Sequence, residues 1–374
     1  MERTRIAIVG GGIAGAATAW SLARYGETDV VLLEAEDQLG AHSTGRNAAI
    51  LRIWSPSEAA TLLAEECARF LACPPPGFAP DPLLDACGTV LVPDDPMPSS
   101  LEHWLASRPP GAVERLDPRR LAELLPAFSG SARRAFLLRE EGRIDVAALL
   151  EGFVRGARAA GVRVRTGARV GALIRRGQRV TGVVLEDGER LEAERVVLAA
   201  GGWAGKLGRK AGSRVALRPT RRHLLVTEPD QSIDPGGPVL WSDPDGFYAR
   251  PESGGWLLCA CDQSEVDPDA WCADEGVREQ IAEKTARLLA CVADAGAAHF
   301  WGGMRTFATD DDFLIGPDPD LAGLDWVAAL GGHGISSAVG VGRLAAELLL
   351  GRETDPALSA ALAPARRPST ALSP

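Results

Sequence analysis

One arginine stands alone in an apolar, glycine-rich segment near the end of the chain. The stretch Trp301–Pro317 reads WGGMRTFATDDDFLIGP, and Arg305 is its only cation. Aromatic residues, methionine and glycine on both sides indicate a buried segment, where a guanidinium is costly unless an anion meets it. Two explanations are open from the residues alone: an ion pair with Asp310, Asp311 or Asp312, or a carboxylate that a ligand brings.

A second arginine and a tyrosine lie in other strand-like segments of the chain. Arg222 follows Arg221 in RPTRRHLLV, and Tyr248 lies in GFYARP. A guanidinium is a planar fork that binds a carboxylate through two hydrogen bonds and keeps its charge when it is desolvated. A tyrosine hydroxyl can donate a hydrogen bond from an otherwise apolar ring. The residues alone also allow Arg222 to be a solvated neighbour of Arg221, and Tyr248 to be an amphipathic strand residue.

The residues that could bind a nucleotide come first in the chain. In RIAIVGGGIAGAATAWSLARYG an apolar run precedes Gly10, Gly12 and Gly15, which have G-x-G-x-x-G spacing, and a helix is expected to about Arg24. The three glycines permit a tight turn, a close approach of a pyrophosphate and close helix packing. The next strand, DVVLLE, ends at Glu34, whose carboxylate can bind a ribose. This order predicts a dinucleotide with its phosphates at the helix N-terminus.

Three later segments favour FAD over NAD. AHSTGRNAAIL follows the second strand closely and carries small hydrogen-bonding groups, RVVLAAGGWAG is a predicted strand with a glycine turn, and DWVAALGGHGISSAVGVGRLAAELLLG is a predicted strand, turn and helix. The last segment supplies a second helix N-terminus, which can stabilise negative charge on the pyrimidine end of a reduced flavin. Three glycine turns that share one long ligand are therefore expected.

These segments together resemble the D-amino-acid oxidase-type FAD oxidoreductases, which include glycine and sarcosine oxidases. The resemblance covers nearly the whole chain, and within the family the bacterial D-arginine dehydrogenase branch is the most similar. It implies an α/β (α+β) fold with a Rossmann-like FAD-binding domain of discontinuous segments, residues 1–80, 140–218 and 322–365. An antiparallel-sheet substrate domain, residues 81–139 and 219–321, is inserted between them. Residues 366–374 are expected to form a loose tail.

The resemblance also implies the site residues. Arg222, Arg305 and Tyr248 would bind the substrate carboxylate. His333 would face the flavin or the substrate, although a histidine bonded only to backbone is an open alternative. The residues implied around FAD are Gly10, Gly12, Ile13, Ala14, Gly15, Glu34, Ala35, His42, Ser43, Thr44, Arg46, Asn47, Ala48, Ala49, Val170, Ala200, Gly201, Trp203, Gly303, Arg305, Gly331, Gly332, His333, Gly334, Ile335 and Ser336.

His42 bears on how the flavin is attached. The related dimethylglycine and sarcosine dehydrogenases bond FAD covalently to a histidine in a comparable place, whereas the D-arginine dehydrogenase type does not. We expect non-covalent FAD.

The expected side-chain pocket differs from that of the D-arginine dehydrogenase branch. That branch holds the substrate guanidinium with an acidic residue, and the matching position falls near Thr89, with Asp85 four residues earlier. Its histidine position is Ile50, and its lid tyrosine falls near Ser55, beside Trp54. A pocket without a fixed anion does not compensate the desolvation of a cationic side chain. Neutral or apolar amino acids are therefore the expected substrates.

The expected reaction is FAD-dependent oxidative deamination of an amino acid, by the resemblance a D-amino acid. The arginine pair would aim the Cα–H at flavin N5, and hydride transfer would leave an imino acid that hydrolyses to a 2-oxo acid and ammonia. Glycine, an N-methyl amino acid or a 2-hydroxy acid remain open as substrates, and so does a flavin-holding subunit without a substrate. Either oxygen or a quinone could accept the electrons, and no general base is identified.

Composition limits the other classes of function. The chain has 374 residues, 46% of them hydrophobic, which is too long for one small domain. A net charge of -10 argues against nucleic acid as a partner. The seven cysteines show no paired metal spacing, so we expect no metal and a reducing, cytoplasmic location. No stretch is long and apolar enough to span a bilayer, so an integral membrane protein is not expected.

Overall fold

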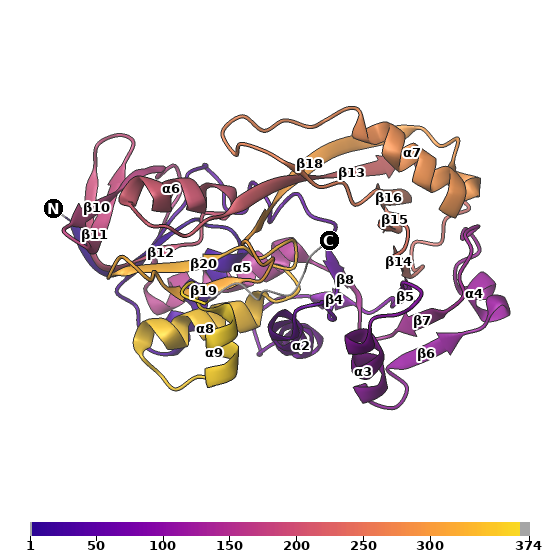
Figure 1. Ribbon diagram of the computed structural model, residues 1–374, viewed down its shortest axis with the longest axis horizontal. Coiled ribbons are helices and arrows are strands. Elements are labelled where there is room, and N and C mark those ends of the chain that lie inside the picture. Colours follow the sequence, from indigo (N-terminus) through magenta and orange to yellow (C-terminus); the bar gives the residue numbers. More distant parts are fainter. Residues whose placement is uncertain (1, 367–374) are drawn as a thin grey trace.

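The strands of residues 2–366, the part of the chain that the computed structural model describes, form sheets of eight, nine and three strands. The N-terminal strand lies in the eight-stranded sheet, at the left of Figure 1, and the nine-stranded sheet extends to the right. The mixed α/β architecture expected from the sequence is therefore confirmed.

The eight-stranded sheet is arranged so that several turns meet at one edge. Its strands are β1 (Glu2–Val9), β2 (Val30–Leu33), β9 (Arg163–Arg165), β10 (Val170–Arg176), β11 (Arg179–Leu185), β12 (Arg190–Leu198), β19 (Leu314–Pro317) and β20 (Leu324–Ala328). β1 is parallel to β2 and to β12, and β12 is parallel to β20. The carboxyl ends of these four strands share one edge, where nucleotides bind in open α/β sheets.

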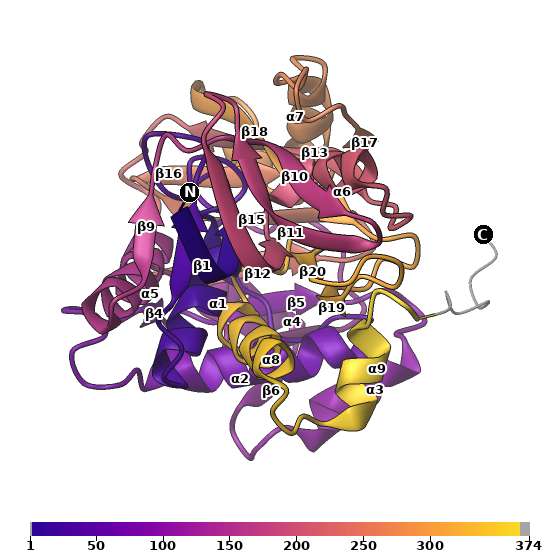
Figure 2. The ribbon, with the colours of Figure 1, turned by 90° about the vertical axis from the view of Figure 1, so that its left-hand side faces the viewer.

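Alternating side chains of β1 fill two cores, one on each face of this sheet. Ile6 and Ile8 pack into the core that includes α1 (Ile13–Arg24), α5 (Val146–Ala160) and α8 (Ala338–Leu350), which Figure 2 shows together on one side. Ala7 and Val9 point to the other core, which includes α6 (Ala204–Ala211). This period of two is that of a strand buried on both faces. Because both faces of β1 are packed in this way, the position of the turn that follows β1 is fixed.

The nine-stranded sheet carries the segments expected to bind substrate. Its strands are β5 (Thr89–Val92), β6 (Val113–Leu116), β7 (Ala135–Leu138), β13 (Arg218–Thr227), β14 (Val239–Ser242), β15 (Phe247–Glu252), β16 (Gly255–Cys259), β17 (Ser264–Glu265) and β18 (Ala297–Phe307). Except for the parallel pair β5 and β14, its strands pair antiparallel. β13 and β18 run side by side over most of their length (Figure 1).

A small sheet and the remaining helices complete the described chain. The small sheet joins β3 (Ile50–Leu51), β4 (Leu84–Asp85) and β8 (Gly142–Ile144) in the order β3-β8-β4. The other helices are α2 (Glu58–Ala72), α3 (Ser99–Ser107), α4 (Pro118–Leu124), α7 (Val277–Leu288) and α9 (Pro356–Leu362), with short 3-10 turns η1 (Gly201–Trp203) and η2 (Ala290–Val292).

The structure differs from the expected domain boundaries in two places. β19 was expected in the substrate domain, yet it pairs antiparallel with β20 and so belongs to the eight-stranded sheet. Arg366, the first residue of the expected loose tail, is anchored: its Nη2 is 2.6 Å from Asp310 Oδ1, and its Nη1 donates to the carbonyl of Phe313 at 2.8 Å. Residues 367–374 of that tail lie outside the described residues. The rest of the division stays a proposal.

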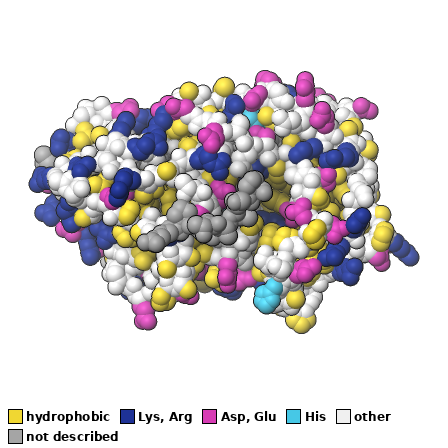
Figure 3. Space-filling view, viewed as in Figure 1, with side chains coloured by type: hydrophobic (Ala, Val, Ile, Leu, Met, Phe, Trp, Pro, Cys, Tyr) yellow, Lys and Arg dark blue, Asp and Glu magenta, His cyan; other side chains and the backbone are white. Residues whose placement is uncertain are grey.

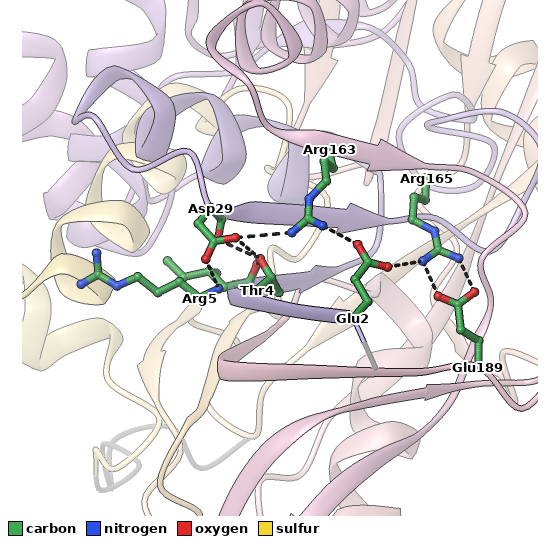
Figure 4. Close-up of polar contacts among 8 residues, drawn as sticks. Glu2, Thr4, Arg5, Asp29, Arg163, Arg165 and Glu189 are labelled. Atoms are coloured by element: carbon green, nitrogen blue, oxygen red, sulfur yellow. Dashed lines mark hydrogen bonds and ion pairs between the residues drawn. The ribbon is translucent and has the colours of Figure 1, made fainter.

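Charged side chains at the amino ends of the parallel strands pair with one another. Figure 4 shows Arg165 with both Nη atoms on Glu189, at 2.6 and 2.7 Å, and Arg163 between Glu2 and Asp29. These pairs are largely exposed and each contributes little stability. They lie at the end of β1 opposite to its glycine turn.

Acidic and basic side chains are interspersed over the face seen in Figure 3. Among residues 2–366, no helix has the length and apolar character needed to cross a membrane.

Candidate active site

The turn from β1 to α1 forms one end of a long cavity. Gly10 has φ +113° and donates its N–H to the carbonyl of Leu33 at 2.8 Å, which joins the turn to β2. A side chain at Gly15 would place Cβ 2.0 Å from the Gly10 carbonyl oxygen, so only glycine lets α1 approach the turn. Gly12 caps α1, and Ile13, Ala14 and Gly15 open it, so the positive helix end faces the cavity without a competing acidic side chain in that turn.

Glu34 is held where a ribose would lie. Its Oε2 accepts a hydrogen bond from Gly11 N–H at 2.8 Å, and its Oε1 accepts one from Glu36 N–H at 2.9 Å. A carboxylate has further acceptor capacity after these two bonds. Since Glu34 also lines the cavity, it can accept hydrogen bonds from ribose hydroxyls, as the sequence predicts.

The cavity runs from this turn to the nine-stranded sheet. It is lined by every residue expected around FAD except Gly15, whose role is to pack α1 against the turn. The segments that follow β2, β12 and β20 all contribute, because those strands end at the same edge. Lining residues that the sequence analysis missed include Glu36, Arg52, Arg169, Leu224, Trp241 and Met304. A dinucleotide cofactor fits this set of glycine turns, a free helix end and an acid.

His42 belongs to a network of side chains with Glu36 and Arg169. Its Nε2 is 3.1 Å from Glu36 Oε1, and its ring centre is 4.6 Å from that of Trp203. Arg169 Nη2 donates to the same Glu36 oxygen at 2.7 Å. The hydrogen bond from His42 is the largest influence that lowers the pKa of Glu36. At the end of the cavity lined by Glu34, the Nε2 of His42 is therefore already bonded to Glu36.

Arg222 and Arg305 come from neighbouring antiparallel strands. Thr220 of β13 lies opposite Arg305 of β18, and Arg222 lies opposite Gly303. Side chains two residues apart on a strand share a face, so the two arginines are diagonal neighbours on one face of the sheet. Both line the cavity, and Arg222 is only 8% exposed. The two arginines are more than eighty positions apart in the sequence. They become neighbours because β13 and β18 are hydrogen-bonded to each other.

None of the three acids that could pair with Arg305 does so within residues 2–366. Asp310 binds Arg366, Asp311 Oδ1 is 3.0 Å from Arg218 Nη2, and Asp312 Oδ1 is buried without a partner. Arg221 Nη2 is 3.3 Å from Asp274 Oδ2. Within residues 2–366, no ion pair of Arg305 or Arg222 with a protein carboxylate is formed, and Arg222 Nε has no hydrogen-bond partner. Arg222 Nη2 donates to Gln263 Oε1 at 3.2 Å, so a ligand carboxylate would be bound by the other N–H groups of Arg222 and by Arg305.

Two glycines bring the arginine pair close to the cofactor turns. A Cβ at Gly332, which has φ +92°, would lie 2.6 Å from Arg305 Cζ. A Cβ at Gly303 would lie 2.6 Å from the backbone oxygen of Arg46. The Arg305 guanidinium thus rests directly on the turn before α8.

Tyr248 and His333 face the same end of the cavity. Tyr248 is 2% exposed, and its ring stacks on Trp241 with centres 4.9 Å apart. Burial raises the pKa of Tyr248, so its hydroxyl stays a neutral donor near pH 7. Burial, and then the nearby charges of Arg305, Arg52 and Arg222, lower the pKa of His333 to about 4. His333 is therefore a neutral imidazole among three cations.

Of the residues expected to line the side-chain pocket, only some line the cavity. Ile50 lines the cavity, but Thr89 and Trp54 are buried elsewhere. Thr89 lies at the start of β5, between β14 and β7, and is fully buried. Asp85 is a mostly exposed partner of Arg143, so it cannot supply the missing acid. The wall next to Ile50 is instead formed by Arg52 and Trp241.

Comparison with known proteins agrees with this arrangement. Residues 5–348 match the protein family described as DAO, FAD dependent oxidoreductase. The chain is 28% identical over 364 residues to 4-methylaminobutanoate oxidase (formaldehyde-forming) of Paenarthrobacter nicotinovorans, covering 92% of this chain and 43% of that protein. It is 26% identical over 380 residues to human mitochondrial dimethylglycine dehydrogenase, covering 93% and 43%. The chain therefore spans less than half the length of these curated relatives.

The fold is also found among solved structures. L-proline dehydrogenase from P. horikoshii superimposes with a TM-score of 0.83 at 20% sequence identity, covering 97% of each chain. At this identity the likeness concerns the fold alone. The family match accounts for nearly all the described elements, including both large sheets.

Proposed function

This chain belongs to the DAO family of FAD-dependent oxidoreductases, and we propose that it oxidises an amino acid at its α-carbon, with the D enantiomer as the expected substrate. The family membership makes it an oxidoreductase with FAD as cofactor that acts on an amino-acid or amine donor. The observation that carries the finer proposal is the pair Arg222 and Arg305, which lines the cavity and has no protein carboxylate as partner within residues 2–366.

The side chains around this pair suit a substrate carboxylate. Two guanidinium groups on one sheet face can bind its oxygens with charge-assisted hydrogen bonds, and Tyr248 can donate a further one. Fixing the carboxylate fixes the α-carbon and its hydrogen with respect to the turn of residues 331–334. Bound FAD supplies the electron sink that accepts the hydride.

The protonation states in the site favour loss of hydride. The substrate amine must be neutral, because its lone pair forms the C=N bond as the hydride leaves. The cations Arg52, Arg222 and Arg305 raise the positive potential near that nitrogen, and this disfavours an ammonium group. The imino acid that results takes up water and gives a 2-oxo acid and ammonia. The chain's own contribution is orientation and charge, without a dedicated base.

A second candidate is oxidation of an N-methyl amino acid. The two curated relatives named above are, by their names, a methylaminobutanoate oxidase and a dimethylglycine dehydrogenase. Their sequences match this chain over more than nine-tenths of its length, although it covers 43% of theirs. In that reaction the hydride leaves the carbon of the N-methyl group, and the same arginine pair would hold the carboxylate.

Anaerobic reduction of the flavin tests the proposal without knowledge of the natural electron acceptor. FAD-loaded protein is mixed with D-amino acids, L-amino acids, glycine, sarcosine and 2-hydroxy acids, and the loss of oxidised-flavin absorbance is followed. Reduction by D-amino acids supports the proposal, and reduction by N-methyl amino acids alone supports the second candidate. If none of these compounds reduces the flavin, the chain is a flavin-holding subunit. Turnover with oxygen and with a quinone analogue then identifies the acceptor.

Amino acids with cationic side chains are expected to be poor substrates. The cavity wall at the substrate end carries Arg52, Arg222 and Arg305, so a further cation is repelled and its desolvation is uncompensated. We expect kcat/KM for D-lysine to be at least about tenfold below that for D-norleucine, which has a similar shape without the ammonium, or about 1.4 kcal/mol. D-arginine as the best substrate by a similar factor would show that an acid reaches the site from elsewhere.

The flavin is expected to be released when the protein is precipitated with acid. This expectation follows from the resemblance to the D-arginine dehydrogenase type. His42 Nε2 is 3.1 Å from Glu36 Oε1, while its Nδ1 has no hydrogen-bond partner within residues 2–366 and is the nitrogen that a covalent bond would use. The supernatant after precipitation should carry the yellow colour and contain FAD by mass spectrometry. Colour that stays in the protein pellet, and an added flavin mass on a peptide with His42, would place the chain with the covalent flavoproteins.

A further inference from the structure

We propose that Arg52 forms a second carboxylate-binding subsite, so that the preferred substrate is an amino acid with a second carboxylate, either on its side chain or on a substituent of its nitrogen. This inference rests on the proposed function, because it assumes that Arg222 and Arg305 hold the first carboxylate. It also replaces the expectation of a neutral or apolar side chain, which rested on Thr89 and Ile50 at the positions of the acid and the histidine of the D-arginine dehydrogenase branch.

Arg52 is a buried cation with one unused end. It follows β3 directly, lines the cavity, and is only 4% exposed. Its Nη1 donates to Glu141 Oε1 at 2.9 Å. Its Nη2 is buried and has no hydrogen-bond partner within residues 2–366. A buried donor without a partner is costly, so a ligand acceptor at this position would be stabilising.

The surroundings of Arg52 hold its guanidinium in place. Glu141 is fully buried, and its Oε1 also accepts the N–H of Ile53 at 2.9 Å, while its Oε2, like Arg52 Nη2, has no hydrogen-bond partner within residues 2–366. The Arg52 backbone N–H donates to Ser336 Oγ at 3.1 Å, which ties it to the turn before α8. Its Cζ lies 5.8 Å from the ring centre of Trp54 and 5.3 Å from that of Trp241. Indole rings at these distances favour a cation and leave its N–H groups free.

Other titratable groups lie around the substrate end. Glu141 pairs with Arg52. Burial opposes ionisation of the Cys259 thiol, but a hydrogen bond from Cys261 and the charge of Arg222 lower its pKa to about 6, so a thiolate can offset one charge of the arginine pair. Asp243, the other acid near Arg52, accepts a hydrogen bond from Trp241 Nε1 at 2.9 Å, and burial raises its pKa. The case for a second substrate carboxylate therefore rests on the unpaired Nη2 of Arg52 and not on a sum of charges.

Such a subsite distinguishes substrates by whether they can accept a hydrogen bond from Arg52 Nη2. A substrate with a carboxylate at the right distance would fill the unpaired Nη2, whereas one with a methyl or amide group there would leave it unpaired or paired with a neutral group. Sites built around buried polar groups reject analogues that cannot satisfy them. The effect should appear mainly in KM, because a hydrogen bond to this second carboxylate is made equally in the bound substrate and in the transition state.

Pairs of substrates with equal shape test this inference. D-glutamate is compared with D-glutamine, and N-(carboxymethyl)glycine with its monoamide, so that the two arms separate a side-chain carboxylate from one on nitrogen. We expect kcat/KM to favour the diacid at least about tenfold in one of the two arms. In the variant Arg52→Met with Glu141→Gln, which leaves no buried carboxylate unpaired, the ratio of kcat/KM for the diacid to kcat/KM for the amide should fall to about one, whatever the rate of the variant.

A binding experiment separates failure of this inference from failure of the proposed function. Glutarate and its monoamide, which cannot be oxidised at an amine, are titrated into FAD-loaded protein, and the flavin spectrum reports binding. Tighter binding of glutarate that depends on Arg52 supports the subsite even if every amino acid in the panel is inert. Equal treatment of acid and amide in both experiments, in wild type and variant, would show that Arg52 serves only to pair with Glu141, and the inference would be overturned.

Discussion

Replacing Arg305 with alanine is expected to lower kcat/KM by about 30- to 5,000-fold, which corresponds to about 2–5 kcal/mol, while FAD stays bound. The guanidinium lines the cavity and has no ion-pair partner within residues 2–366, so its removal deletes a contact to the substrate and leaves the protein network intact. Arg222→Ala should behave similarly. Steady-state kinetics with the best amino acid of the panel measures the effect.

A neighbouring arginine provides the matched control. Arg221 precedes Arg222 and pairs with Asp274, and its side chain is 19% exposed. Arg221→Ala should keep kcat/KM within about twofold of wild type, because Arg221 points to the face of β13 opposite to Arg222 and does not line the cavity. Arg305→Lys keeps the charge but loses the two-pronged geometry, and an intermediate rate is expected. Near-normal kcat/KM in Arg305→Ala would return this arginine to a purely structural role.

Gly15→Ala is expected to abolish stable FAD binding. The added Cβ would lie 2.0 Å from the carbonyl oxygen of Gly10, which is backbone and cannot move aside without shifting the turn or α1. Overpacking of this kind typically costs about 1–3 kcal/mol. The displaced turn would also lose the close approach that a pyrophosphate needs. We expect a lower melting temperature and a protein that is purified largely without flavin.

Flavin content and thermal unfolding are measured on the same preparation. Gly236→Ala is the control, because the nearest atom to its added Cβ is Asp234 Oδ1 at 3.4 Å, an ordinary contact. That variant should keep its flavin and its melting temperature. A Gly15→Ala protein with a full complement of FAD would contradict the assigned role of this glycine.

The nucleotide half of the site could be read from the sequence because its determinants are local. Gly10, Gly12, Gly15 and Glu34 lie within one strand, turn, helix and strand, so their spacing alone implies their geometry. The helix was expected to about Arg24, and α1 ends there. The lone cation Arg305 was visible for the same kind of reason, because a charge amid apolar neighbours signals a buried polar function.

The substrate half depended on contacts between distant segments. Sequence alone could not choose between a ligand and Asp310, Asp311 or Asp312 as the partner of Arg305; the fold pairs Asp310 with Arg366 and Asp311 with Arg218, and forms no ion pair of Asp312 with Arg305 within residues 2–366. The same signal is present at Arg52 in ILRIW, but nothing local shows that Arg52 lies beside the cavity.

The errors have the same physical origin. The resemblance to the D-arginine dehydrogenase branch places Thr89 in the pocket, but pairing of β5 with β14 and β7 turns it into the core instead. The range 219–321 expected for the substrate domain includes β19, yet β19 pairs with β20. Local spacing determines turns and helix ends, because those form within a few residues. Which strands become neighbours, and hence which side chains share a cavity, is decided by long-range burial and pairing across the whole chain.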